Sequence, residues 1–380
     1  MCSAPSRPRT GPHGDRLAQV VARARSAGVD HLVLTPGEDL LYLTGERLDS
    51  HERLTALVVP VGEAGSVDGR VLLQPALECT GRSRAAAARV GAELRTWTDG
   101  EDAVGLLAAL LPGSRELAVS AACPALHLVP LLGLLDAHPR TASAFVDPVR
   151  AVKTPEELGQ LAEAAQRIDA VHARMGEFLR VGRTEREVAE RVAAAIVEEG
   201  LDHAEFVIVA SGPNGADPHH EVSDRVVERG DVVVVDIGGP LASGYHSDCT
   251  RTYVLGEPAP EVAETYSVLQ EAQRLAREAV RPGRAIGEVD AAAREHLEAA
   301  GLGEYFTHRT GHGIGLGLHE PPFAAPGATT VLAEGMTFSI EPGVYLPGRW
   351  GARLEDIVAV TADGCLALDD GPRGLTRLDG

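Results

Sequence analysis

Four acidic residues stand within or at the end of apolar stretches that otherwise indicate buried strands. Asp236 closes VVVVD, Asp248 lies in HSDCTRTYVL, Glu341 closes MTFSIE and Glu355 lies in ARLEDIVAV. An unpaired carboxylate is costly to bury in such a strand. Four carboxylates that converged would also repel one another unless a cation compensated them. A fold that buries these strands must therefore gather the four acids around positive charge, or leave each of them at the surface.

A fifth residue belongs with these acids. His312 lies in RTGHGIGLGLHE with a glycine on each side, which suits an imidazole presented without crowding. Each of the five residues alone is more often a turn residue, a surface charge or a structural histidine. Together they form an oxygen-rich ligand set with one nitrogen, which suits two divalent ions such as Mn²⁺, Co²⁺ or Zn²⁺. Two ions roughly 3.5 Å apart can share and activate a hydroxide.

The chain of 380 residues is long enough for two domains. We expect residues 1–14 to form a disordered tail, because they are rich in Pro, Ser and Arg. Residues 15–150 alternate helical and strand patterns, beginning with an amphipathic helix over 15–29 and a strand over 31–35. This alternation predicts a small α/β domain.

A second domain is expected over residues 151–380. Thr154 begins a helix of roughly 25 residues, because it is followed by Pro155 at the first helical position and by Glu157 three residues later. Thr184 repeats the signal. Long helices and mostly adjacent strands over this part of the chain predict an α+β fold with an antiparallel sheet.

Composition excludes several classes of partner. The 55 acidic residues outnumber the 35 Lys and Arg, so the net charge of −20 argues against nucleic acid and anionic membrane as partners. No apolar run of about 18 residues indicates a transmembrane helix. The five cysteines are scattered and form no CxxC pair, which favours a reducing environment and a cytoplasmic protein.

The stretches VVVVDIGG, SDCTRT, GHGIG, SIEPG and RLEDIV resemble, in order, those of the pita-bread metallopeptidases, a family that includes methionine aminopeptidase, prolidase, aminopeptidase P and creatinase. The resemblance spans essentially residues 15–370. It implies a pita-bread catalytic domain behind a smaller creatinase-like N-terminal α/β domain. It also implies two divalent ions, with Mn²⁺ expected first. Their ligands would be Asp236, Asp248, His312, Glu341 and Glu355, with Asp248 and Glu355 bridging.

The same resemblance assigns residues on the substrate side. His219 and His319 match the two family histidines that would position the carbonyl and stabilise the oxyanion, and Arg353 matches an arginine that supports the ligands. Glu341 would also accept a proton, and Tyr345 is expected to line the site. His220 is interpreted as secondary. Strand alternation turns Cys249, next to Asp248, toward the opposite face.

The N-terminal domain narrows the choice to aminopeptidase P or prolidase, both of which cut before proline. Prolidases carry an arginine for the substrate carboxylate at the position that Phe323 occupies here, and an apolar ring cannot pair a carboxylate. We therefore expect a Xaa-Pro aminopeptidase that uses a metal-bridged hydroxide, with Phe323 in the substrate site. A Xaa-Pro dipeptidase is the alternative. In that case Arg349 or an arginine of a partner subunit could bind the carboxylate of the dipeptide.

Two further alternatives remain. One is a non-catalytic metal-binding scaffold, against which the intact ligands speak, and the other is a related hydrolase activity such as that on organophosphate esters. The expected partners are proline-containing peptides and a second copy of the chain in a homodimer.

Overall fold

The structure is a computed structural model that describes residues 12–49, 51–62 and 68–379. The chain divides into two compact units between Arg150 and Ala151. Most of the expected tail lies outside the described residues, but Pro12–Gly14 form the first turn of helix α1 (Pro12–Ser26), where a tail was expected. Proline suits a first helical turn because its missing N–H would have no partner there.

A six-stranded sheet forms the centre of the first unit, in the order β4-β3-β2-β1-β5-β6. β1 pairs antiparallel with β2 and parallel with β5. The strands are β1 (His31–Leu34), β2 (Ala56–Pro60), β3 (Val71–Pro75), β4 (Glu93–Trp97), β5 (Glu116–Val119) and β6 (His138–Thr141). The helices after α1 are α2 (Glu38–Thr44), α3 (Gly81–Val90), α4 (Ala103–Ala109), α5 (Ala125–Leu134) and α6 (Ser143–Arg150). The predicted α/β class of this unit is confirmed.

The second unit holds a four-stranded sheet, β17-β9-β8-β7, a five-stranded sheet, β11-β10-β12-β15-β16, and the hairpin β13-β14. Its strands are β7 (Phe206–Ser211), β8 (Val232–Pro240), β9 (His246–Leu255), β10 (Gly311–Gly313), β11 (Glu320–Ala324), β12 (Thr337–Ile340), β13 (Gly343–Leu346), β14 (Trp350–Arg353), β15 (Asp356–Val360), β16 (Cys365–Ala367) and β17 (Thr376–Leu378). Neighbouring strands are antiparallel except for β17 and β9.

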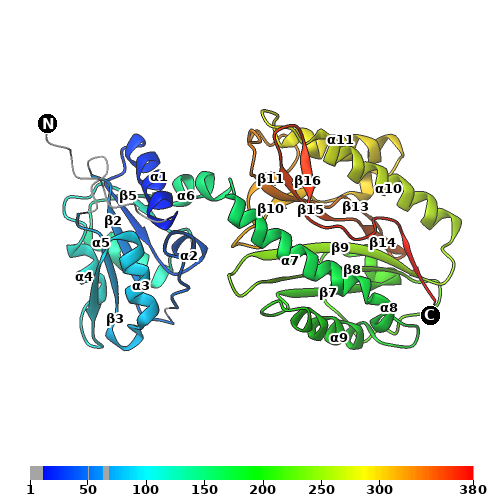
Figure 1. The fold of residues 1–380 in the computed structure, drawn as a ribbon, viewed down its shortest axis with the longest axis horizontal. Coiled ribbons are helices and arrows are strands. Elements are labelled where there is room, and N and C mark those ends of the chain that lie inside the picture. The colour runs from blue at the N-terminus through cyan, green and yellow to red at the C-terminus, as the bar shows by residue number, and fades with distance from the viewer. Residues whose placement is uncertain (1–11, 50, 63–67, 380) are drawn as a thin grey trace, which may run out of the picture. The chain divides into compact units, whose positions relative to one another are not determined.

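Helices cover the strands of the second unit from two sides. In Figure 1, α10 (Pro260–Ala279) and α11 (Gly287–Ala299) lie on one side of the strands, and α8 (Met175–Phe178) and α9 (Glu185–Glu198) lie on the other. One apolar core joins α10 and α11 to β12 and β15, and a second joins α7 (Pro155–Ala173), α8 and α9 to β7, β8 and β9. This layering confirms the predicted α+β class.

The helix starts of the second unit follow the predicted capping signals. Thr154 and Thr184 each accept a hydrogen bond from the backbone N–H three residues later, and the glutamate side chain there accepts one from the backbone N–H of the threonine. The helix from Thr154 is shorter than expected, because α7 ends at Ala173 and the separate short helix α8 follows. No helix among the described residues is both long and apolar enough to cross a membrane.

Candidate metal centre and active site

Strand pairing brings the two aspartates together. In the β8–β9 ladder Asp236 lies opposite Thr250 and Gly238 lies opposite Asp248, so both carboxylates project from the same face of the sheet. Glu355 follows β14 and donates its backbone N–H to the carbonyl of Thr250 at 3.2 Å. The two sheets therefore meet where these three acids stand.

The other two predicted ligands reach the same place from the second sheet. His312 is the central residue of β10, and Glu341 directly follows β12. The backbone N–H of Glu341 donates a hydrogen bond to the carbonyl oxygen of Thr310 at 2.8 Å. All five predicted ligands line one cavity of about 680 Å³. Carboxylate oxygens of Asp236, Asp248 and Glu355 lie within 4.8 Å of one another.

The imidazole of His312 is oriented for coordination. Its Nδ1 lies 3.1 Å from the carbonyl oxygen of Gly313, which can only accept, so Nδ1 carries the proton. Nε2 then turns its lone pair toward the acids, 3.4 Å from Asp248 Oδ2 and 3.3 Å from Glu341 Oε1. A neutral histidine that binds a metal through Nε2 has this arrangement, in which a hydrogen bond from Nδ1 to a backbone carbonyl fixes the tautomer.

The glycines beside His312 are required by close backbone packing. A Cβ on Gly311 would lie 1.8 Å from the carbonyl oxygen of Ser339, and a Cβ on Gly313 would lie 2.5 Å from that of Glu320. No side chain fits at either position. The histidine is therefore held in a short strand pressed between β11 and β12.

The raised pKa values of two of the acids and their unpaired oxygens are those expected of a cation site without its cation. Burial, followed by the charges of Asp236 and Glu341, raises the pKa of Asp248 well above its usual value. Burial, followed by the charge of Asp248, does the same for Glu355. Asp236 Oδ1 and Glu355 Oε1 are buried with no hydrogen-bond partner among the described residues. Divalent ions would satisfy these oxygens and remove the repulsion.

Arg353 connects the ligands through hydrogen bonds. It donates to Asp236 Oδ2 at 2.6 Å, to the Tyr345 hydroxyl at 2.8 Å and to Thr250 Oγ1 at 3.0 Å. Thr250 in turn donates to Glu355 Oε2 at 2.8 Å. One buried guanidinium thus orients two of the carboxylates, and it leaves three formal negative charges for other cations to balance.

The substrate-side predictions fall into two groups. His219 and His319 line the cavity with exposed side chains, and the rings of His319 and His312 lie 3.9 Å apart. Tyr345 is buried behind Arg353, and Phe323 sits in β11 with 36% exposure; neither is among the residues that line the cavity. Partial desolvation of the His319 ring where it stands against the cavity, followed by the neighbouring His312, lowers the pKa of His319 to about 4.

Among the cavity-lining residues that sequence reasoning missed, His308 and Arg309 carry polar side chains that bear on the chemistry of the site. His308 accepts the Tyr345 hydroxyl on Nε2 at 2.9 Å, since its Nδ1 donates to the carbonyl of Arg309 at 2.7 Å. A chain of hydrogen bonds therefore runs from His308 through Tyr345 and Arg353 to Asp236. The sequence signal for His308 was its position four residues before His312.

A buried glutamate anchors the loop that carries His219. Glu185 accepts hydrogen bonds from the backbone and hydroxyl of both Ser211 and Ser223, from Asn214 and from His220 Nε2 at 2.8 Å. Burial alone would raise the pKa of Glu185, but these hydrogen bonds outweigh it and lower the pKa to about 2. His220 is thus a structural partner of Glu185, in keeping with its interpretation as secondary.

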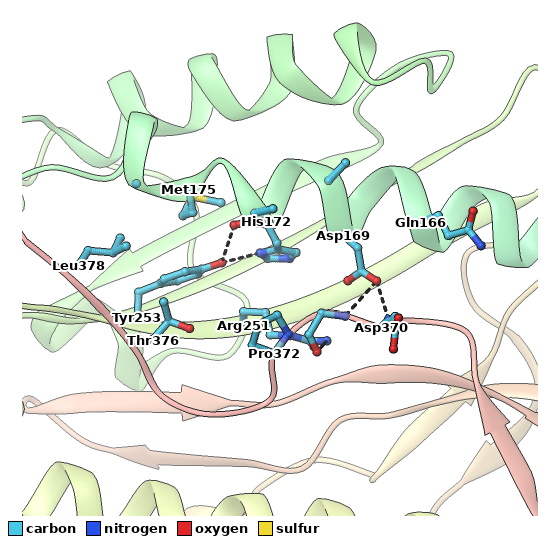
Figure 2. Close-up of a pocket in the computed structure, with 14 residues that line it drawn as sticks. Gln166, Asp169, His172, Met175, Arg251, Tyr253, Asp370, Pro372, Thr376 and Leu378 are labelled. Atoms are coloured by element: carbon cyan, nitrogen blue, oxygen red, sulfur yellow. Dashed lines mark hydrogen bonds between the residues drawn. The ribbon is translucent and has the colours of Figure 1, made fainter.

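A second cavity of about 640 Å³ lies on the opposite face of β9, where Arg251 and Tyr253 alternate with the residues that face the ligands. Figure 2 shows His172 of α7 joined to the Tyr253 hydroxyl. Its other ring nitrogen donates to the carbonyl of Cys249 at 3.1 Å, and burial lowers the pKa of His172 to about 3. With both nitrogens engaged, this histidine has no atom to offer a substrate. Cys249 itself is buried on this side, where strand alternation had placed it.

The two-sided α+β fold, with five candidate ligands in one cavity, is that of the pita-bread metal-dependent hydrolases. Residues 159–362 match metallopeptidase family M24, and residues 16–152 match the creatinase/prolidase N-terminal domain. The chain belongs to metallopeptidase family M24.

Similar proteins cover nearly the whole chain. It is 52% identical over 361 residues to the probable dipeptidase PepE of Mycobacterium tuberculosis, which covers 95% of each chain. The crystal structure of dipeptidase PepE from Mycobacterium ulcerans superposes with a TM-score of 0.92 at 49% identity, over 98% of this chain and 100% of that one. The Xaa-Pro dipeptidase of Pyrococcus furiosus is 41% identical over 231 residues, 60% of this chain and 66% of that protein.

Proposed function

We propose that the chain is a dinuclear-metal Xaa-Pro dipeptidase. The observation that carries this proposal is the similarity to dipeptidases over 95% of both chains, together with a complete set of five ligands in one cavity. The expectation of an aminopeptidase P is therefore reversed in favour of its alternative. The scaffold alternative is disfavoured, because the relatives that span nearly the whole chain are named as dipeptidases and because none of the five predicted ligands is missing from the cavity.

The first group of site residues would bind the metal ions or hold their ligands in place. Two divalent ions, Mn²⁺ first with Co²⁺ or Zn²⁺ as alternatives, would supply Lewis acidity and a water of lowered pKa at neutral pH. Asp236, Asp248, His312, Glu341 and Glu355 would hold them. Arg353 keeps the carboxylates of Asp236 and, through Thr250, Glu355 in place.

Proton transfer and carbonyl binding fall to the residues around the cavity. The Glu341 carboxylate would take a proton during attack. Its Oε1 is fixed by the hydroxyl of Ser339 at 2.9 Å. His219 and His319 would bind the scissile carbonyl and the oxyanion that forms from it. Tyr345 would orient Arg353 and His308 through its hydroxyl. Phe323 would contribute through its contact with Arg309 at the edge of the site.

The test compares turnover of Ala-Pro and Ala-Pro-Ala by the Mn²⁺-loaded protein, with a chelator control. We expect the dipeptide to be the better substrate and chelation to abolish its hydrolysis. Glu341→Gln should lose activity, whereas Glu334→Gln, an exposed glutamate a few residues earlier, is the matched control. Preference for the tripeptide would restore the aminopeptidase interpretation. Inactivity on both with metal bound would restore the scaffold. Light scattering tests the expected homodimer.

A further inference from the structure

Arg309 and Phe323 lie against each other at the edge of the candidate site. Phe323 is in β11, where it pairs with the ligand His312 of β10. The guanidinium carbon of Arg309 lies 4.3 Å from the centroid of the Phe323 ring. A cation–π contact of this kind holds a guanidinium in place without using its N–H groups. The aromatic ring therefore orients a cation whose donors remain available.

The Arg309 side chain reaches the cavity that holds the ligands. It lines this cavity together with His219, His319 and the five predicted metal ligands. Its charge is one of the influences that lower the pKa of His319. A positive charge therefore stands close to the residues expected to bind the scissile carbonyl.

Arg309 is also the arginine of this cavity that has no carboxylate partner. Within the described part of the chain, neither a hydrogen bond nor an ion pair engages its guanidinium. By contrast, Arg353, which lines the same cavity, is fully engaged with Asp236, Tyr345, Thr250 and the carbonyl of Pro218. Arg349, which sequence reasoning offered as a carboxylate partner, is exposed and pairs with Glu261 at 2.5 Å.

We propose that Arg309, held against the ring of Phe323, binds the C-terminal carboxylate of a dipeptide substrate. The inference rests on the proposed dipeptidase function and names the residue that sets its substrate length. A free dipeptide brings a negative charge within a few bonds of four carboxylates, so it needs a cation beside its C-terminus. The forked N–H groups of a guanidinium match a carboxylate in two parallel hydrogen bonds.

This assignment gives Phe323 a different part from the one expected. Phe323 does not open the site to longer peptides; it acts as the platform of the arginine that recognises the chain end. A longer peptide or a C-terminal amide offers no carboxylate at this position, and it leaves the Arg309 donors without a charged acceptor. Selection for dipeptides then follows from the charge of Arg309, which the ring of Phe323 helps to position.

The decisive measurement compares an Ala-Pro analogue with a reduced, uncleavable peptide bond and its C-terminal amide. Calorimetry on the Mn²⁺-loaded protein gives the ratio of their affinities independently of turnover. We expect the wild type to favour the acid, and Arg309→Met to reduce the acid-to-amide ratio on the order of 10- to 100-fold. Arg309→Lys should retain part of the ratio, and Phe323→Leu should reduce it while keeping the charge.

Metal content and hydrolysis of Ala-Pro, measured on the same proteins, separate the possible failures. An acid-to-amide ratio that is the same in wild type and Arg309→Met overturns the inference, and so does a wild type that binds acid and amide equally. A wild type that discriminates through Arg309 but hydrolyses no Xaa-Pro dipeptide supports the carboxylate site and contradicts the proposed function. Arg284→Met, at an exposed position paired with Glu288, is the matched control for loss of an arginine.

Discussion

Lys153 donates from Nζ to Glu320 Oε1 at 2.7 Å, and each of these two side chains is only 1% exposed. Lys153 is also the only lysine in the chain, whose other basic residues are all arginines. Glu320 follows His319 directly and accepts the backbone N–H of Gly317 on its second oxygen at 3.1 Å. The buried ion pair thus ties the start of the second unit to the loop that presents His319.

Removal of this ammonium should destabilise the fold. Lys153→Met leaves the Glu320 carboxylate buried without its cation, and we expect a loss of about 3–5 kcal/mol in the free energy of unfolding. Urea denaturation of the chelated protein measures it. The double variant with Glu320→Gln removes both charges and should recover much of the loss. Equal stability of the single and double variants would show that the pair is not coupled.

Arg353 is expected to govern metal affinity without coordinating metal. A lysine at this position cannot reach Asp236, Tyr345 and Thr250 at once, because an ammonium lacks the planar fork. Arg353→Lys should weaken Mn²⁺ binding by about 10- to 100-fold, as for other residues that orient metal ligands. Competition with a chromogenic chelator measures the affinity. Arg349→Lys, on the exposed surface, is the control, and unchanged affinity in Arg353→Lys would refute this role.

The candidate ligands that meet in one cavity stand out in the sequence because they are anomalies within single strands. An acid that closes VVVVD or MTFSIE contradicts the local pattern, so Asp236 and Glu341 are visible without any knowledge of the fold. The α+β class of the second unit followed from its capping boxes and strand runs. The helix from Thr154 was predicted too long, because nothing in the local pattern marks the break at Arg174 between α7 and α8.

Other site residues could not be found this way, since their environment depends on contacts between distant segments. Glu185 has the sequence context of an ordinary acidic residue in a first helical turn. Its burial appears only when the segment from Ser211 to Ser223 folds over it. Likewise, the contact between Arg309 and the ring of Phe323 depends on the pairing of β10 with β11. Spacing along the chain carries no information about such pairs.

The metal-free ligand cluster should be under electrostatic strain that Asp248→Asn relieves. Burial and neighbouring acids raise the pKa of Asp248, so its charge opposes folding when no cation is bound. We expect the chelated variant to melt no lower than the chelated wild type. Mn²⁺ at one hundred times Kd should stabilise the wild type by about 2.7 kcal/mol for each ion bound, and the variant hardly at all. Thermal scans with and without chelator give both quantities.

Asp363→Asn is the control for this experiment, because Asp363 is an exposed acid in a turn of the same unit. It should keep the full Mn²⁺-dependent shift. If Asp248→Asn retained the wild-type Mn²⁺-dependent shift, Asp248 would not be a metal ligand. If the chelated variant melted far below the chelated wild type, the predicted electrostatic strain would be contradicted.

Glu185 should make stability depend on pH in the acid range. Its pKa is lowered from 4.5 to about 2 in the folded protein, so the stability it contributes is complete above about pH 4.5 and is lost as the pH falls toward 2. The full contribution is at most about 3 kcal/mol, from the size of the shift. Glu185→Gln removes the charge that the hydrogen bonds of Ser211, Ser223 and His220 stabilise. Its deficit relative to the wild type should therefore be largest near pH 7 and shrink steadily below pH 4.5.

Urea unfolding of the wild type and Glu185→Gln at pH 7, 5, 4 and 3 follows this deficit, with chelator present so that metal release does not contribute. Glu190→Gln, an exposed glutamate on the same helix, should show no comparable deficit at any pH. Because Glu185 also anchors the loop of His219, Glu185→Gln should raise the KM for Ala-Pro more than it lowers kcat. A deficit that stays constant from pH 7 to pH 3 would mean that the carboxylate contributes through shape and neutral hydrogen bonds, not through its charge.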